Sequence, residues 1–258
     1  MAVDDKHTLP VAEHHSAPTS SEEVTVWRSG GCLLPLENGD KSPVAIYRSL
    51  KCRLMAGEFP AGERLRPDTL KKQYGISASG VREVLVRLTH EKLLEQPEQR
   101  GFHVPEASEQ LLGELMDLRI LLECEGARQS IEQGDIEWEA RLNAAHHKLA
   151  HLESKMHTAT DLMAFIPIWT RVDWEFHDTL LSACPSTTLR QTHRHVYERF
   201  RQQVVAAINL AGFREATLTE HEAILQAAID RDVAACQAAI HAHLQTFRDD
   251  FQEWLRPN

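Results

Sequence analysis

Residues 77–104 read SASGVREVLVRLTHEKLLEQPEQRGFHV, a helical pattern followed by a strand pattern. Ser77 can cap a helix, because its hydroxyl can accept a hydrogen bond from a backbone N–H of the first turn. The helix is predicted to run to about His90, with these apolar side chains on one face: Val81, Val84, Leu85 and Leu88. The LLEQPEQRGFHV that follows contains a central proline and glycine, which predicts two short strands around a turn.

Two further helices are expected before this stretch. Apolar spacing predicts one over residues 44–56, ended by the FPAG turn, and a short one over 67–74, stopped by Gly75. Helix, short helix, tight turn, helix and hairpin are the elements of a winged helix-turn-helix, a DNA-binding fold. A small α+β domain without a DNA role is the alternative. Because the turn, the cap and the hairpin agree, we predict a winged helix-turn-helix over residues 43–105.

Charge divides the chain at the same place. The 258 residues carry a net charge of −10, yet residues 44–105 hold 11 Lys and Arg against 7 Asp and Glu, a net of +4. Residues 106–258 hold 14 basic and 24 acidic residues, and residues 1–43 hold 3 and 7. The basic module can therefore approach DNA phosphates although the chain as a whole is acidic.

From Ser108 onward the pattern is helical only. Six helices are expected: 108–133, 136–155, 163–183, 187–209, 217–230 and 232–255. Their short connections predict an all-helical antiparallel bundle over residues 106–258. The fold class is therefore mainly α, with a winged helix-turn-helix before the bundle. Residues 1–42 are rich in Ser, Pro, Gly and acidic side chains and are predicted to form a flexible arm.

The composition also bears on location. No apolar run approaches the roughly 18 residues that a bilayer span requires, and the N-terminus lacks a signal-peptide pattern. The five cysteines are scattered without a C-x-x-C pair, which indicates unpaired thiols in a reducing compartment. We therefore expect a cytoplasmic protein with no membrane partner.

Residues 172–181, VDWEFHDTLL, place two polar side chains beside an apolar stripe. Asp173 and His177 are four residues apart, so they share one helical face and can point at one ion. The ordinary alternative for any single histidine is a hydrogen-bonded or solvated side chain. That alternative is expected for these histidines of the second half: His146, His147, His151, His157, His193, His195 and His241.

Several motifs resemble the GntR family of bacterial transcription regulators. They are GEFPAGERL at 57–65, VREVL at 81–85 and RGFHV at 100–104. The second half resembles the helical FadR-type ligand-binding domain, with LRILLE at 118–123. The stretch GDIEWEARLNAAHHKLAHLE at 134–153 is most similar to the carbon-starvation-induced (CsiR-like) subgroup. The resemblance implies a transcription regulator.

FadR-type domains without an acyl-CoA site commonly hold a metal ion through one Asp and three His. Asp173 and His177 match the D-x-x-F-H motif, His221 matches the E-H of TEHEAIL, and His243 matches the H-L of HAHL. The resemblance thus implies a divalent cofactor on Asp173, His177, His221 and His243. Imidazole and carboxylate suit Zn²⁺ or Ni²⁺.

The resemblance also places Arg119 near an effector site, where a guanidinium can fork onto a carboxylate. The alternative for Arg119 is an ion pair with Glu123, four residues on. Expected proximity adds three weaker effector candidates: Arg171, Tyr197 and Arg201. The implied effector is a small organic acid, with a dicarboxylate as the first candidate.

For DNA, Arg82 is the foremost candidate, because it lies one turn into the recognition helix, opposite its apolar face. Ser77 and Ser79 can meet phosphates at the helix N-terminus. Secondary candidates are Arg66, Arg100, Gly101 and His103. Ala78 and Ser79-Gly80 stand where the family usually has Arg and Thr-Pro or Thr-Thr, so a base-reading side chain is missing and the operator sequence cannot be carried over from the family.

A single recognition helix reads few base pairs, so we expect a homodimer on a partly palindromic double-stranded operator. Release of DNA on effector binding, hence repression, is the default that the family implies. Two alternatives stay open. One is a metal-dependent hydrolase, against which stand the missing general base and the winged module. The other is a constitutive DNA-binding protein with a purely structural bundle.

Overall fold

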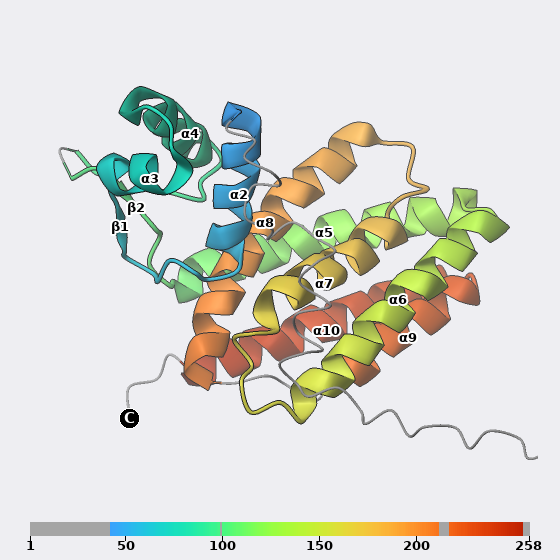
Figure 1. Cartoon of the computed structure of the whole chain (residues 1–258). Coiled ribbons are helices and arrows are strands. Elements are labelled where there is room, and N and C mark those ends of the chain that lie inside the picture. Colours follow the sequence, from blue (N-terminus) through green and yellow to red (C-terminus); the bar gives the residue numbers. More distant parts are fainter. Residues whose placement is uncertain (1–41, 99, 212–216, 255–258) are drawn as a thin grey trace, which may run out of the picture.

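The computed structural model describes residues 42–98, 100–211 and 217–254, and these ranges contain nine helices and one two-stranded sheet. The helices form an N-terminal module of three and a C-terminal bundle of six, which lie against each other (Figure 1). Apart from Ser42, the arm predicted for residues 1–42 lies outside the described ranges.

The N-terminal module consists of α2 (Pro43–Met55), α3 (Pro67–Tyr74) and α4 (Ala78–His90). Ser42 caps α2 by accepting from the Ala45 N–H at 3.2 Å, and Ser77 caps α4 by accepting from the Gly80 N–H at 3.2 Å. The turn between α3 and α4 begins at Gly75, whose φ of 64° lies in the left-handed region that favours glycine. The predicted helix-turn-helix is therefore present, with its bounds within one residue of those expected.

The wing differs from the predicted hairpin. Strand β2 (Phe102–His103) pairs antiparallel with β1 (Arg64–Leu65), which precedes α3, and Glu95 contributes only an isolated bridge to His103. Leu93 and Leu94 lie instead in the hydrophobic core. The sequence did not show β1, because a two-residue strand is too short for alternation to register. Gly101, with φ 84°, turns the wing where an added Cβ would lie 3.3 Å from the Arg64 guanidinium.

The bundle consists of six helices close to the predicted bounds. They are α5 (Glu109–Gln133), α6 (Ile136–His157), α7 (Ile166–Leu180), α8 (Thr187–Ala211), α9 (Thr217–Ile229) and α10 (Val233–Trp254). The largest difference is α7, which is shorter than predicted at both ends. A proline in its first turn fits the later start, because that position needs no backbone donor. No described helix is both long and apolar enough to cross a membrane.

Each half has its own hydrophobic core. Leu50, Leu85 and Phe102 belong to the N-terminal core, and Trp138 and Phe176 to the core of the bundle. Cys124, Cys184 and Cys236 are free thiols, as expected. Cys52 is disulfide-bonded, so the expectation of unpaired cysteines is wrong there, because spacing along the chain does not show which thiols meet in space.

Within the described residues, polar contacts of Glu198 and Gln202 join α8 of the bundle to the module. The Lys51 ammonium of α2 lies 2.7 Å from the Glu198 carboxylate, and the Gln202 amide donates to the Leu93 carbonyl at 3.0 Å. Figure 1 shows α2 standing beside α8 at this joint. A displacement of α8 would therefore reach the DNA-binding module directly.

Candidate metal centre

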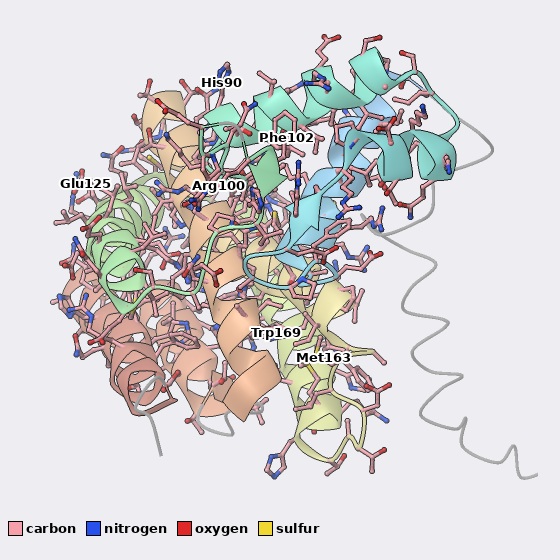
Figure 2. The ribbon with its side chains drawn as sticks, turned by 90° about the vertical axis from the view of Figure 1, so that its left-hand side faces the viewer. His90, Arg100, Phe102, Glu125, Met163 and Trp169 are labelled. Atoms are coloured by element: carbon pink, nitrogen blue, oxygen red, sulfur yellow. The ribbon has the colours of Figure 1, made fainter. Side chains whose placement is uncertain are left out.

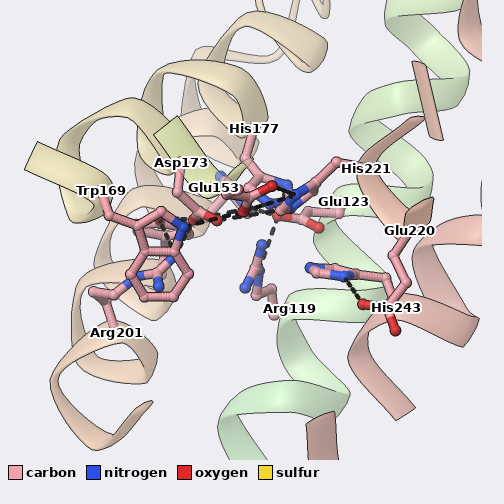
Figure 3. Close-up of polar contacts among 12 residues, drawn as sticks. Arg119, Glu123, Glu153, Trp169, Asp173, His177, Arg201, Glu220, His221 and His243 are labelled. Carbon is pink, nitrogen blue, oxygen red and sulfur yellow. Dashed lines mark hydrogen bonds and ion pairs between the residues drawn. The ribbon is translucent and has the colours of Figure 1, made fainter. Parts of the chain in front are cut away.

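The four predicted metal ligands meet inside the bundle. Asp173 and His177 come from α7, His221 from α9 and His243 from α10, and all four side chains are buried. The three histidines offer ligand atoms that lie within 4.8 Å of one another. The Asp173 Oδ1 atom lies 3.6 Å from His221 Nε2, and Asp173 Oδ2 lies 4.0 Å from His177 Nε2. Figure 3 shows these side chains pointing toward one another.

A carboxylate stands behind each histidine, at Nδ1. Glu123 Oε1 lies 3.2 Å from His177, Glu153 lies 3.3 Å from His221, and Glu220 lies 2.8 Å from His243. A proton held at Nδ1 leaves the Nε2 lone pair free for an ion. The Nε2 atoms of His177 and His221 are buried without a hydrogen-bond partner, and so is Nδ1 of His177, which lies beside Glu123 at ion-pair distance only. Such atoms cost free energy unless something binds them, so the donor set fits a metal ion.

The protonation states suit the same chemistry. Burial opposes ionisation of Asp173, but the charges of Arg201, His177 and His221 outweigh it and hold the pKa of this carboxyl below its ordinary value. Burial lowers the pKa of His177 to about 3 and also lowers the pKa of His243. Metal ligands must be a carboxylate and neutral imidazoles, and these three groups are in that form near neutral pH.

His221 differs, because it lies between two carboxylates. Burial opposes its charge, yet Glu153 and Asp173 raise its pKa above the ordinary value. Binding of an ion needs the neutral imidazole, so a metal ion and a proton would compete for His221.

Arg119 of α5 reaches the same centre and is 1% exposed. Its Nε donates to Glu123 Oε1 at 2.9 Å, and its guanidinium carbon lies 4.9 Å from the centroid of the Tyr197 ring. Its Nη2 is buried without a hydrogen-bond partner. The Nε edge of the Arg119 guanidinium is therefore bound to Glu123, and Nη2 can still donate a hydrogen bond to a buried anion.

The other effector candidates divide. Tyr197 and Arg201, both buried on α8, donate to Asp173 Oδ2, and Arg201 also lies over the Trp169 ring at 4.1 Å. They hold the aspartate in place. Arg171 is half-buried and lies two residues before Asp173. Side chains two apart on a helix do not share a face, so Arg171 lies on a different face of α7 from Asp173.

Four residues of the centre escaped the sequence reasoning. Glu123 was considered only as a pair for Arg119, and His193 only as an ordinary histidine, yet His193 Nε2 lies 2.8 Å from Glu123 Oε1 and both are fully buried. Glu153 and Glu220 were not singled out. Each is on a different helix from the histidine it contacts, so no local spacing joins them. His146 is buried, and its Nε2 lies 3.4 Å from Glu222 without a hydrogen bond, so the expected hydrogen-bonded or solvated histidine is not found there.

The DNA-binding candidates lie on the N-terminal module. Arg82, Arg66 and Arg100 are exposed, as phosphate or base contacts require. Ser77 caps α4, and its hydroxyl lies 3.0 Å from that of Ser79. Gly101 shapes the wing, and its carbonyl lies 3.2 Å from His103 Nδ1. The wing can be followed in Figure 2 at the labels of Arg100 and Phe102.

Comparison with known proteins follows the same division. Residues 44–104 match the gntR family of bacterial regulatory proteins, and residues 114–246 match the FCD domain. The chain belongs to the GntR family. Within this family it is a DNA-binding transcription regulator with an effector-binding FCD domain.

Two curated relatives support the assignment of the chain to the GntR family. The chain is 32% identical over 216 residues to the HTH-type transcriptional regulator BphR of Paraburkholderia xenovorans, and the match covers 83% of this chain and 86% of BphR. It is 28% identical over 207 residues to the HTH-type transcriptional repressor GlaR of Escherichia coli, covering 78% and 91%. The matched families and relatives are transcription regulators, so the hydrolase alternative is rejected.

Solved structures show the same fold. The GntR regulator superposes on E. coli McbR/YncC with a TM-score of 0.70 at 21% identity, covering 83% of this chain and 98% of the other. A GntR transcriptional regulator of Rhodococcus sp. RHA1 gives 0.68 at 20%, covering 83% and 99%. The winged helix-turn-helix joined to an all-helical bundle is thereby confirmed.

Proposed function

We propose that this regulator binds a partly palindromic operator as a homodimer, and that a small carboxylate bound beside a divalent metal ion releases it. In this proposal residues 43–105 bind DNA, and residues 106–258 bind the effector and dimerise. A role in DNA binding also supports the cytoplasmic location expected from the sequence.

The metal part depends on the buried cluster. Asp173 Oδ1 and the ring nitrogens of His177, His221 and His243 would hold Zn²⁺ or Ni²⁺, because three imidazoles and one carboxylate suit these borderline ions. The single observation that carries this part is the pair of buried, unpartnered Nε2 atoms on His177 and His221. When bound, the ion supplies positive charge with coordination positions left for an anionic ligand.

The effector part depends on Arg119. Its unpartnered Nη2 can donate to a carboxylate, which makes a small mono- or dicarboxylate the best candidate. A long acyl chain suits the site poorly, since charged side chains surround it. Residues of α5 also line two surface hollows of about 440 Å³ and 520 Å³, but none of the residues that line these hollows belongs to the buried cluster.

Control of DNA binding would pass through α8. Tyr197 and Arg201 donate to Asp173, while the residue after each of them contacts the DNA-binding module. Glu198 pairs with Lys51, and Gln202 donates to the Leu93 carbonyl. A ligand that alters the partners of Asp173 would shift α8 and with it the recognition helix. This link favours ligand control over a constitutive DNA-binding protein.

Repression is the favoured direction. GlaR, which is 28% identical to the chain, is named a transcriptional repressor. An effector that releases a repressor from its operator would switch transcription on.

The test combines calorimetry with gel shifts. A panel of mono- and dicarboxylates is titrated into metal-loaded wild type, Arg119→Ala and His243→Ala, and each complex with the chain's own promoter is challenged with the best ligand. We expect binding and DNA release in wild type, and loss of both in the two variants. Arg128→Ala is the control, because Arg128 lies on α5 but is partly exposed and paired with Glu125 and Glu132. An uncharged best ligand, or equal binding by all variants, would overturn the proposal.

A further inference from the structure

The carboxylates next to His177 and His221 have different second partners. Glu153, beside His221, also accepts from the Trp169 indole N–H at 3.1 Å. Glu123, beside His177, accepts from Arg119 Nε at 2.9 Å. It therefore touches both a metal-ligand candidate and the arginine assigned to the effector.

The contacts of Glu123 crowd onto one oxygen. Its Oε1 lies 2.9 Å from Arg119 Nε, 2.8 Å from His193 Nε2 and 3.2 Å from His177 Nδ1. Its Oε2 is buried and has no hydrogen-bond partner. Arg119 Nε and His193 Nε2 are hydrogen-bonded to Oε1, whereas His177 Nδ1 is buried beside it without a hydrogen-bond partner. A carboxylate oxygen accepts about two hydrogen bonds well, so Oε1 is already filled when His177 needs an acceptor, while Oε2 offers room. Figure 3 shows Glu123 between Arg119 and the histidines.

This competition has a consequence for ligand binding. An ion on His177 would fix the ring and strengthen its Nδ1–H as a donor to Glu123 Oε1. Arg119 would then turn toward Oε2, which changes where its Nη2 points. In the opposite direction, an effector that binds the Arg119 guanidinium and breaks its contact with Glu123 would free Oε1 to accept from His177 Nδ1. Coupling of this kind is reciprocal by thermodynamic necessity.

We propose that Glu123 is a positioning residue that couples the metal centre to the effector arginine through its shared Oε1 atom. The proposal rests on the proposed function, since it assigns an ion to His177 and an effector to Arg119. It adds that neither site has an affinity independent of the other. His193 holds the same oxygen from α8, so the coupling is anchored on the helix that contacts the DNA-binding module.

The experiment uses Zn²⁺ alone as the probe, so no effector need be known. Zn²⁺ affinity is measured on the metal-free full-length chain by competition with a chelating dye. The variants are Arg119→Lys, Glu123→Gln and their combination. Lysine keeps the positive charge of Arg119 but lacks the Nε–H that binds Glu123. Long-range charge therefore stays constant while the contact is lost.

Glu153→Gln serves as the matched control for Glu123→Gln, and it is measured alone and combined with Arg119→Lys. Glu153 supports His221 as Glu123 supports His177, and both glutamates are fully buried. Loss of either should weaken Zn²⁺ binding by about 10- to 100-fold, the usual effect of removing such a partner. We expect Arg119→Lys to weaken Zn²⁺ binding about fivefold in wild type and in Glu153→Gln. In the Glu123→Gln protein, Arg119→Lys should change the affinity for Zn²⁺ less than twofold.

The outcomes separate the two levels of inference. An equal effect of Arg119→Lys in all backgrounds, or no effect in wild type, overturns the coupling while leaving the metal site in place. Wild type that binds no Zn²⁺, or binds it as tightly after His177→Ala, overturns the proposed function and the coupling with it. Glu123→Asp provides a second variant if the glutamine form does not fold. It keeps the charge but withdraws the oxygen by one methylene, and it should abolish the effect of Arg119→Lys in the same way.

Discussion

The Gln202 side chain of α8 donates a 3.0 Å hydrogen bond to the backbone carbonyl of Leu93, just beyond the recognition helix α4. The residue before it, Arg201, donates to Asp173 inside the bundle. Two neighbouring residues of one helix thus contact the candidate metal centre and the DNA-binding module. A change in the contacts of Asp173 would therefore act on Arg201, and through the next residue, Gln202, on the DNA-binding module.

We expect Gln202→Ala to uncouple DNA binding from the ligand. The substitution leaves the Leu93 carbonyl without its donor, at a cost of about 1–3 kcal/mol for a buried polar group. Binding to the native promoter should persist, because no DNA-facing side chain is changed. Release by metal and effector should weaken at least threefold in a gel-shift titration. Gln226→Ala, at an exposed glutamine of α9, should keep the full response, and equal responses from both variants would count against the α8 route.

Arg82→Ala should abolish specific operator binding and leave the fold intact. Arg82 is exposed on α4, so its removal opens no cavity. Loss of one good base contact costs about 1–3 kcal/mol of discrimination, and a dimer loses two. Gel shifts on the native promoter should show a complex at least tenfold weaker. Arg141→Ala removes the same charge from an exposed site on α6 and should bind like wild type. Unchanged affinity in Arg82→Ala would exclude a base-reading role.

Local patterns were sufficient for the helices and for the pairing of Asp173 with His177. Apolar periodicity and caps act within a few residues, so helix bounds such as Pro67–Tyr74 could be predicted from the sequence. The four-residue spacing of Asp173 and His177 likewise fixes a shared face. His221 and His243 were assigned through the family resemblance, and the structure brings them to the same centre.

The surrounding carboxylates could not be predicted, because packing between helices decides their partners. Glu220 precedes His221 in the sequence but contacts His243 of α10, whereas His221 contacts Glu153 of α6. Glu123 has the spacing of a surface ion pair with Arg119, and only the bundle shows that both are buried. The β1 strand was missed for a related reason, since its pairing depends on the distant wing.

We expect Glu91 to stabilise the DNA-binding module in a pH-dependent way. It accepts from the Tyr47 hydroxyl at 2.7 Å and from Lys51 at 2.9 Å, and so ties α4 to α2. Burial opposes its charge, but Tyr47 and Lys51 hold its pKa below the ordinary value. A depressed folded-state pKa adds stability above the ordinary pKa of about 4.5, and this stability is lost as pH falls through the folded-state value.

Glu91→Gln should therefore lower the melting temperature at pH 7, where the carboxylate is ionised. A loss of about 1–2 kcal/mol is expected, since charged hydrogen bonds are replaced by neutral ones. Thermal unfolding followed by circular dichroism from pH 7 downward should show the gap to wild type narrowing below about pH 4.5. Glu98→Gln, at an exposed position in the wing, should match wild type throughout. A gap that widens on acidification would contradict this role of Glu91.

Metal should stabilise the bundle, because its ligands come from α7, α9 and α10 and tie three helices together. An ion that binds only the folded state adds about 2.7 kcal/mol at a free concentration of 100 times Kd. For a chain of this size, a strong chelator should lower the melting temperature by about 5–10 °C, and Zn²⁺ or Ni²⁺ should restore it. Elemental analysis of protein purified without an affinity tag should find about one ion per chain.

A comparison of His243→Ala with His241→Ala separates stabilisation by the metal ion from the general effect of removing a histidine. Both residues lie on α10, but His243 is buried at the centre and His241 is exposed. His243→Ala should lose most of its response to the chelator, because one of four ligands is gone, while His241→Ala should keep it. If wild type carries no ion and does not respond to chelator, Asp173 and the three histidines form a polar network of the core and no metal site.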